Sequence, residues 1–331
     1  MDSTNNDKTL QELSPLKFNI KQIINVLKKK PEFTKDAISI KKFEDNSSDN
    51  KNPKYLITQK NNTFSFSLIV NDLFQRDDLC INTYANNDSY FGYFKNDKRN
   101  QIGFYSFAPT SSEKFRYSEY YYGSWENDLK HGNGIYLWLK EREKRDKPFT
   151  LYKLANFKAY IGSFENDSPK KGVLLKKRAK DFYIYYGKFS KDFTEKHGKN
   201  CFYYSFTLKQ IYFGKFRSGR FVNGFIGKFD ENDKLIDIIK YYRRKIYEYE
   251  EIPKEEIDNT SKIMNDFLNV VKSKDYFRMV YDEFSKINEL KNLYKGDVES
   301  GKEVKYEDIS ENLKGYNKLN ICEDIENGVK Y

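Results

Sequence analysis

The sequence predicts a mainly β protein: an elongated single-layer antiparallel sheet of stacked hairpins, followed by a C-terminal α-helical segment. Two repeated columns of residues and one feature of the composition lead to this prediction. Six glycines have an aromatic residue two positions before and two positions after them, and Asp, Gly or Asn stands five positions after each glycine. The chain also has 28 Tyr and 27 Phe among 331 residues. Such a composition suits thin, ring-rich layers better than a thick aliphatic core.

The first column consists of aromatic–glycine–aromatic triplets. The six triplets are Tyr90, Gly92, Phe94; Tyr121, Gly123, Trp125; Tyr160, Gly162, Phe164; Tyr185, Gly187, Phe189; Tyr212, Gly214, Phe216; and Phe225, Gly227, Phe229. Residues two apart in a strand share a face, so the three members of a triplet point the same way. We expect a ring from a neighbouring hairpin to fill the gap that each glycine leaves.

The second column lies five residues beyond each glycine. Its members are Asp97, Asp128, Asp167, Asp192, Gly219 and Asn232. These residue types tolerate the left-handed conformation that tight hairpin turns require. Because a single hairpin is only marginally stable, the units are expected to stack and bury one another's rings.

With both columns in view, the chain resembles MORN repeats over about residues 90–235. The best match is the segment 121–137, which includes the His131–Gly134 sequence typical of the second half of that repeat. The resemblance implies an elongated single-layer antiparallel sheet. MORN arrays serve in junctional membrane proteins, in ciliary and basal-complex scaffolds, and as appendages to lipid kinases and methyltransferases. Successive key glycines here lie 31, 39, 25, 27 and 13 residues apart. We therefore expect a degenerate array of five to six units that ends in a half repeat.

The parts outside the array are assigned from composition and periodicity. The predicted order is a weakly ordered N-terminal segment (1–60) with one short helix, the hairpin array (61–250), a helical segment (251–294) and an acidic, loosely ordered tail (295–331). Apolar residues at Ile263, Phe267 and Val271 follow helical spacing. We expect this segment to pack on the sheet or to cap its end, and the alternative is a helix that docks a partner.

Charge is unevenly distributed along the chain. The net charge is +10, but residues 251–331 hold 13 Lys and Arg against 18 Asp and Glu, so the rest carries +15. A basic body favours anionic partners. The sharpest candidate site is the cluster of Lys170, Lys171, Lys176, Lys177 and Arg178, which we expect to contact anionic lipid or another anionic partner. The alternative is an exposed strand edge protected by lysines.

Motifs of catalysis are not recognised in the sequence, so we expect a protein that is not an enzyme and needs no cofactor or metal. His131 and His197 each precede a glycine at the start of a return strand, which indicates a repeat position. Three distant cysteines, an N-terminus without an apolar leader and the lack of a long apolar run predict a reducing compartment and no transmembrane segment. Nucleic acid is disfavoured as a partner, because the repeat columns already account for the aromatic residues.

These features lead us to expect a cytoplasmic, non-catalytic scaffold or adaptor that binds protein partners at a cytoskeletal, ciliary or membrane-associated structure. The first alternative is a membrane adaptor that binds anionic lipid such as phosphoinositide, and the second is a regulatory subunit of a separate enzyme. A Val side chain at Gly123 is expected to crowd the ring packing and disrupt its unit.

Overall fold

A computed structural model describes most of the predicted array and its helical segment. The described residues are 38–43, 54–60, 65–70, 78–84, 86–112, 115–142, 156–178, 181–190, 192–193, 195–242, 245–300 and 321–329. They belong to two compact units: the first comprises 1–108, 125–128 and 287–314, and the second comprises 109–124, 129–286 and 315–331. The helix expected in the N-terminal segment lies outside the described residues.

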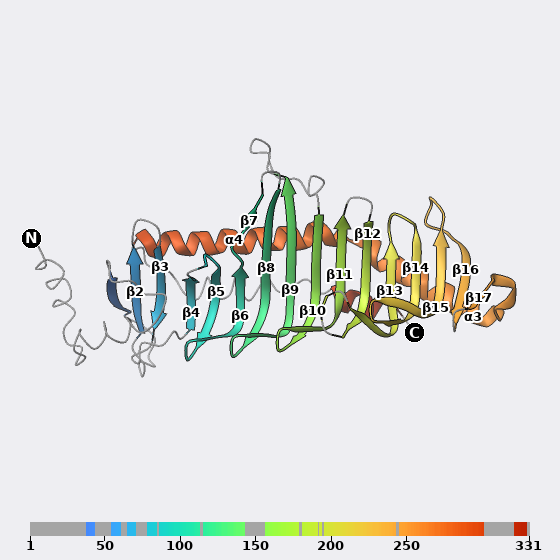
Figure 1. Ribbon diagram of the computed structural model, residues 1–331, viewed down its shortest axis with the longest axis horizontal. Helices are drawn as coiled ribbons and strands as arrows, with labels where there is room; N and C mark the ends of the chain where they lie inside the picture. The colour runs from blue at the N-terminus through green and yellow to red at the C-terminus, as the bar shows by residue number, and fades with distance from the viewer. Residues whose placement is uncertain are drawn as a thin grey trace, which may run out of the picture. The chain divides into compact units, whose positions relative to one another are not determined.

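A small three-stranded antiparallel sheet comes first in the chain (Figure 1). Its strands, in the order β1-β2-β3, are β1 (Ile38–Phe43), β2 (Lys54–Lys60) and β3 (Ser65–Val70). The sequence analysis expected no strand before residue 60, and β1 and β2 differ from that expectation. The polar composition of this segment favours disorder, but Ile38 and Ile40 alternate with polar neighbours, which is a strand signal.

The main sheet has 14 antiparallel strands, and its strand order follows the chain order, with β7 paired to β8 at the side. This confirms the predicted fold class, a single open sheet of stacked hairpins. The strands are β4 (Asp78–Thr83), β5 (Ser89–Lys95), β6 (Lys98–Ser106), β7 (Thr110–Ser111), β8 (Phe115–Glu126), β9 (Leu129–Arg142), β10 (Asn156–Glu165), β11 (Ser168–Arg178), β12 (Asp181–Phe189), β13 (Lys196–Ser205), β14 (Gln210–Arg217), β15 (Arg220–Phe229), β16 (Leu235–Tyr242) and β17 (Lys245–Tyr247).

Four of the six positions of the second column have the predicted left-handed conformation, whereas Asp192 is not among the residues with positive φ. The pairs Asn96-Asp97, Asn127-Asp128, Asn166-Asp167 and Ser218-Gly219 all have positive φ, between 48° and 78°. Two successive residues with positive φ are the mark of the type I′ turn, whose twist matches that of the strands it joins. In the turn after β15 the left-handed residue is Asp233, one position beyond the predicted Asn232.

The repeat tyrosine covers its own glycine. Its hydroxyl donates to the carbonyl of the residue after that glycine in four hairpins: Tyr90 to Tyr93 (3.0 Å), Tyr121 to Ser124 (2.8 Å), Tyr160 to Ser163 (2.8 Å) and Tyr185 to Lys188 (3.0 Å). A second glycine faces the first across three of these hairpins, as Gly134 faces Gly123. The expectation that a neighbouring hairpin supplies the covering ring was therefore wrong. The tyrosine reaches over because two bare backbones leave room for its ring.

Neighbouring hairpins contribute a different ring contact. In the second unit three of the four repeat tyrosines meet, edge-on, the Phe two residues after the glycine of the next hairpin. The pairs are Tyr121 with Phe164 (centroids 5.2 Å apart, 85°), Tyr160 with Phe189 (5.2 Å, 86°) and Tyr185 with Phe216 (5.3 Å, 75°). Edge-on pairs add about 0.5–1.5 kcal/mol each beyond the area that they bury. This ladder joins the hairpins into one layer.

Turn aspartates add a polar link between successive hairpins. In the first unit, the Asp128 carboxylate accepts from the backbone NH (2.9 Å) and the Nε (3.1 Å) of Arg99, and the Asp128 NH donates to the Arg99 carbonyl. In the second unit, Asp167 makes the equivalent contacts with Lys130, including an ion pair of 2.9 Å. Each turn thus binds a basic residue of the preceding hairpin.

The sixth predicted unit is not a hairpin of its own. Phe225 to Phe229 lie in β15, the return strand of the fifth hairpin, where Gly224 already pairs with Gly214. Gly227 lies three residues beyond Gly224 and so faces the other side of the sheet, where an added Cβ would stand 2.7 Å from the Sδ of Met264. This glycine makes room for a helix, and the predicted count of up to six units is corrected to five.

The helical segment is confirmed and covers one face of the sheet. It comprises η2 (Tyr249–Glu251), α3 (Lys254–Ser273), α4 (Tyr276–Ser300) and α6 (Ile321–Gly328). In the second unit, Phe267 of α3 stacks on Phe202 (4.3 Å, 5°), and Phe277 of α4 packs on Phe157 (5.4 Å). Both sheet residues lie opposite to the repeat tyrosines, on what we term the helix face; the face that carries Tyr121, Tyr160 and Tyr185 is termed the tyrosine face. In Figure 1 the helices lie behind the strands.

The described parts of the predicted tail, 295–300 and 321–329, differ from the loosely ordered segment that was expected, because nearly all of these residues belong to α4 and α6. Helix α6 contacts β10 and β11, with Ile321 and Ile325 fully buried. Its Glu326 accepts a hydrogen bond from the Tyr186 hydroxyl (2.7 Å), and the Cys322 thiol donates to the Ile161 carbonyl (3.3 Å). The acidic composition suggested disorder. A short amphipathic helix such as α6, however, needs only a few apolar residues on one side to pack against an apolar surface.

Candidate anion-binding site

The five cations of the predicted cluster all lie on β11 but do not form one surface. β11 pairs with β10 on one side and with β12 on the other, so it is an interior strand. The alternative that these lysines protect an exposed edge is therefore wrong. Because side chains alternate along a strand, neighbours such as Lys176 and Lys177 point to opposite faces.

The two lysines at the start of β11 are engaged by carboxylates. Lys170 is exposed and forms an ion pair with Glu165 across the hairpin (2.6 Å). Lys171 forms an ion pair with Glu326 of α6 (2.7 Å) and lies over the Tyr186 ring on the helix face. Hydrogen bonds from Lys171 and then from Tyr186 lower the pKa of Glu326. Lys171 thus holds a helix of its own chain.

Lys177 lies on the helix face, beside the Phe182 ring (5.9 Å). It borders a hollow of about 630 Å³ between the strands and the junction of α3 with α4. Aromatic residues and charges of both signs line this hollow, among them Phe157, Phe206, Phe277, Lys272, Arg278 and Asp282. Its mixed charges do not single out one class of ligand.

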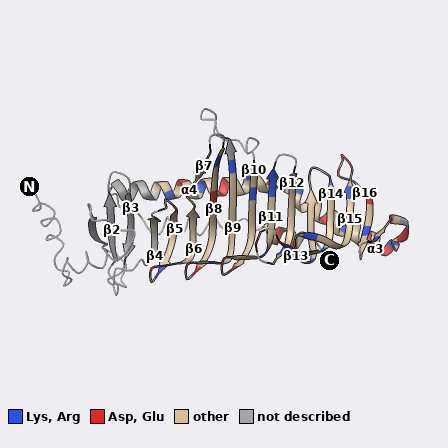
Figure 2. Cartoon of the chain, viewed as in Figure 1, with Lys and Arg blue, Asp and Glu red and all other residues tan. Residues whose placement is uncertain are grey.

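The last two basic positions face the other way. Lys176 is on the tyrosine face, directly opposite Lys158 of β10. Arg178 is exposed two residues further along the same side of β11, whose C-terminal end is blue in Figure 2. Like charges directly opposite each other destabilise a sheet. Charges placed in unfavourable surroundings are a feature of binding and catalytic sites.

A third lysine, Lys196 of β13, belongs to the same surface and was not among the predicted residues. Its Nζ lies 4.5 Å from the centroids of both Tyr183 and Tyr203, and Tyr183 is also 5.4 Å from the Nζ of Lys176. The Nζ of Lys158 lies 4.1 Å from the Trp138 ring. We call Lys158, Lys176 and Lys196 the lysine row.

Burial and the charge of a neighbouring lysine disfavour the charged forms of Lys158 and Lys196. Burial, and then the charge of Lys176, lower the pKa of Lys196 to about 8. The same two causes lower the pKa of Lys158, although Asp192 and Glu119 act in the opposite direction. Ammonium groups that are half withdrawn from water and lie on aromatic rings attract an anion more strongly than solvated ones. The arrangement is chemically suited to bind oxyanions.

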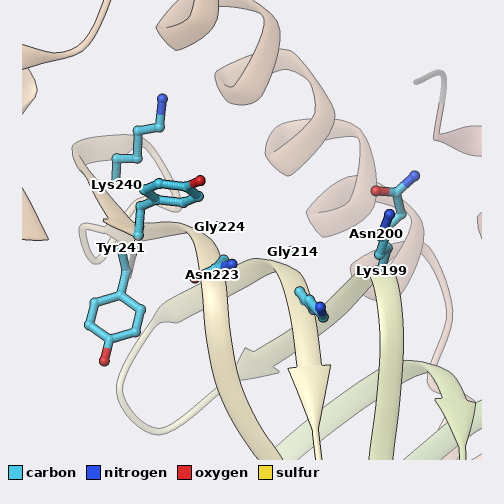
Figure 3. A pocket seen from close by; sticks show the side chains of 9 residues that line it. Lys199, Asn200, Gly214, Asn223, Gly224, Lys240 and Tyr241 are labelled. Atoms are coloured by element: carbon cyan, nitrogen blue, oxygen red, sulfur yellow. The ribbon is translucent and has the colours of Figure 1, made fainter. Parts of the chain in front are cut away.

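A second hollow, of about 360 Å³, lies above the fifth hairpin (Figure 3). Lys199, Asn200, Lys240 and Tyr241 surround the bare backbone of Gly214 and Gly224 there. The atoms nearest to Gly214 are backbone atoms of β15, not a tyrosine hydroxyl. Tyr212 instead donates to Gln210 (3.3 Å) and packs edge-on against Phe221. The hollow exists because this tyrosine leaves its glycines uncovered.

Residues with catalytic or metal-binding potential occupy repeat or packing positions. His131 and His197 each lie within the first three residues of a return strand, before Gly132 and Gly198. Burial raises the pKa of the Cys201 thiol, which donates to the His197 carbonyl. Within the described ranges, no three His, Cys, Asp or Glu side chains gather as a metal-ligand set. A search of the helices in the same ranges finds none with the length and apolar character needed to cross a bilayer.

Comparison with known proteins adds no relative: no protein-family model matches the chain, and a search of curated proteins finds no match.

Proposed function

We propose that this chain is a non-catalytic scaffold or adaptor, built as a degenerate MORN-type array, that holds a protein partner on its tyrosine face. The observation that carries the proposal is the unequal use of the two faces in the second unit. Helices of the same chain cover the helix face, through contacts such as Phe202 with Phe267. On the tyrosine face the three repeat tyrosines that define it are buried, but the rings of Trp138, Tyr183 and Tyr203 and the lysine row remain partly exposed. Aromatic residues are enriched in protein interfaces, and a charged patch guides a partner of opposite charge to its place.

The sheet itself supports a role in positioning. Edge-on ring pairs such as Tyr160 with Phe189 join the second hairpin to the third, the third to the fourth and the fourth to the fifth. Interlocked rings and paired backbones make a stiff surface, so a partner can bind without ordering it first. We place the protein in the cytoplasm, at a cytoskeletal, ciliary or membrane-associated structure, as the sequence analysis expected.

A membrane adaptor is the second candidate, and one observation favours it. Three basic residues in succession, Lys176 to Arg178, end β11. Each cation near an anionic membrane contributes about 1 kcal/mol. Lys177, however, lies on the helix face, so only two of the three share a surface.

Fractionation of cells that carry a tagged chain tests both candidates. We expect the chain to remain in a detergent-insoluble assembly, and we expect the double variant Lys176→Glu, Arg178→Glu to be released. A Glu at position 176 would face Lys158, so the sheet should tolerate it. The control is Lys170→Glu, outside the lysine row. Release of the unaltered chain by detergent alone would contradict the scaffold and favour the membrane adaptor.

A further inference from the structure

Lys196 occupies a position that recurs in the array. In the first two hairpins, Arg99 and Lys130 follow the turn, accept a backbone hydrogen bond from the next hairpin's turn and lie over the repeat tyrosines. Lys196 does the same in the fourth hairpin: its carbonyl accepts from the NH of Gly219 (3.1 Å), and its Nζ lies 5.4 Å from the Tyr185 ring. The three cations are therefore equivalent by backbone contact and by ring.

The three positions differ in one group, the turn carboxylate that binds the cation. Arg99 and Lys130 each bind the carboxylate of the turn residue that caps them, Asp128 or Asp167. The residue in that place for Lys196 is Gly219, which has no side chain. Among the described residues, no carboxylate lies within ion-pair distance of Lys196. The fourth hairpin thus keeps the cation and its aromatic seat but lacks the carboxylate found in the other two.

We propose that the lysine row, Lys158, Lys176 and Lys196, binds carboxylates from an acidic, extended segment of a protein partner. The proposal rests on the proposed function, since it names the chemistry of the partner that the tyrosine face holds. A carboxylate is the ligand because Asp128 and Asp167 fill the equivalent places within the chain itself.

The spacing of the row fits an extended chain. Lys158 and Lys176 lie on adjacent strands, and Lys196 lies two strands beyond Lys176. The Nζ atoms of Lys176 and Lys196 lie 5.4 Å and 4.5 Å from the centroid of the same Tyr183 ring. They are therefore at most about 10 Å apart, the reach of about three residues of extended peptide. Acidic residues at alternate positions can therefore reach more than one lysine.

The charges around the lysine row determine how much each lysine contributes to binding of the carboxylates. Asp192 and Glu119 act on Lys158 and offset part of its charge. Lys176 acts on both other lysines, and Lys196 feels no such carboxylate. Lys196 and Lys176 therefore contribute most to binding, and Lys158 contributes less.

The test measures the binding of a short fluorescein-labelled peptide of alternating Glu and Ser to the full chain by anisotropy. A matched peptide of Gln and Ser serves as the ligand control. We expect Lys196→Met to weaken binding of the Glu peptide at least tenfold, because Met keeps the packing on the rings and removes the charge. Lys170→Met, outside the row, should bind as the unaltered chain does.

A variant that removes no lysine gives the sharper test. Gly219→Asp restores the residue found at Asp128 and Asp167, and Asp tolerates the φ of +78° there. Its carboxylate should occupy Lys196 and weaken peptide binding at least fivefold while the chain stays folded. Equal binding by Gly219→Asp and the unaltered chain would overturn the proposal.

A last experiment distinguishes a carboxylate of a protein partner from a lipid headgroup as the ligand of the lysine row. Vesicles of phosphatidylserine should bind no better than neutral vesicles to the unaltered chain. Binding to phosphatidylserine that depends on Lys196, without binding of the Glu peptide, would overturn the carboxylate proposal in favour of a lipid headgroup. The scaffold is tested by whether the unaltered chain stays in the detergent-insoluble fraction, and that result does not depend on whether the Glu peptide binds. Failure of this inference and failure of the scaffold are therefore distinguishable.

Discussion

The hydroxyl of Tyr121 lies 2.6 Å from the point where a Cβ on Gly123 would stand. The same place is 2.6 Å from the Asn133 carbonyl oxygen on the paired strand. Side-chain atoms do not approach this closely, so the tyrosine and the glycine exclude any larger residue at position 123.

Gly123→Val should therefore destabilise the second hairpin by about 3 kcal/mol or more, since Tyr121 must leave its place and lose its hydrogen bond to Ser124. Thermal melting measures the effect. The control is Asn133→Val, which puts the same side chain at an exposed strand position beside Gly134. An unchanged melting temperature for Gly123→Val would contradict the tyrosine-over-glycine packing.

Loss of a repeat hydroxyl should cost more in the third hairpin than in the fifth. Tyr160 donates to Ser163 (2.8 Å) and also approaches the Lys171 carbonyl (3.0 Å), whereas Tyr212 donates only to the side chain of Gln210. We expect Tyr160→Phe to lower the free energy of unfolding by about 1–2 kcal/mol, because it leaves buried carbonyls unsatisfied. Tyr212→Phe should change it by less than about 0.5 kcal/mol. Urea unfolding of both variants measures the two losses. Equal losses would contradict the different roles of the Tyr160 and Tyr212 hydroxyls.

Docking of α6 should weaken in acid. The pKa of Glu326 is lowered in the folded chain by Lys171 and Tyr186, so its contribution to stability is present above the ordinary Glu pKa and is lost as the pH falls through the lowered value. Cys322 lies on the side of α6 that faces the sheet, where its thiol donates to the Ile161 carbonyl, so it reports on this step. Burial raises the pKa of its thiol to about 12.

We expect 4,4′-dithiodipyridine, which modifies thiols in acid, to label Cys322 faster below pH 4 than at pH 6. Glu326→Gln should label faster than the unaltered chain at pH 6 and should lose most of this pH dependence. Glu323→Gln, on the exposed side of α6, is the matched control. A labelling rate in Glu326→Gln that rises as steeply in acid as in the unaltered chain would show that another group controls docking.

The lysine row should reduce stability at neutral pH. Lys196 has a folded pKa of about 8, below its usual value of 10.5, so at pH 7 the folded state carries a charge that its surroundings disfavour. Between pH 8 and 10.5 the folded chain loses this proton first, and stability rises. Lys196→Met should therefore be more stable than the unaltered chain at pH 7, and the difference should narrow towards pH 10.

Urea unfolding at the two pH values measures this difference, with Lys170→Met as the control. Because both chains share every other titrating group, the difference isolates Lys196. A Lys196→Met chain that is less stable at pH 7 would mean that the charge is well accommodated on its rings.

The turns were predictable because their chemistry is local. Asn166 and Asp167 take positive φ for reasons contained in two residues, and no distant contact is needed to foresee them. The division of the basic cluster was also present in the sequence, since the adjacent Lys176 and Lys177 must alternate. The side of the sheet that Gly227 faces follows in the same way, because Gly227 lies an odd number of residues from Gly224.

Lys196 was not predictable from the sequence. Its place beside Lys176 depends on the pairing of β12 with β13, where the register shifts between Tyr186 and Lys188. Between these positions β13 has three residues more than β12, and such an irregularity changes which side chains meet across strands. The pattern of Arg99, Lys130 and their aspartates would have identified Lys196 as a repeat position only once the turn contacts between hairpins were known.

Strand order that follows chain order has a consequence for how such a chain can change in evolution. Deletion or duplication of a complete hairpin, such as β10 with β11, leaves the following strand in its original direction and keeps Tyr185 on the same face. Gain or loss of a single strand would reverse every strand beyond it. Arrays of this kind are therefore expected to change length in pairs of strands, so that one gene duplication can lengthen the surface without redesign of the rest.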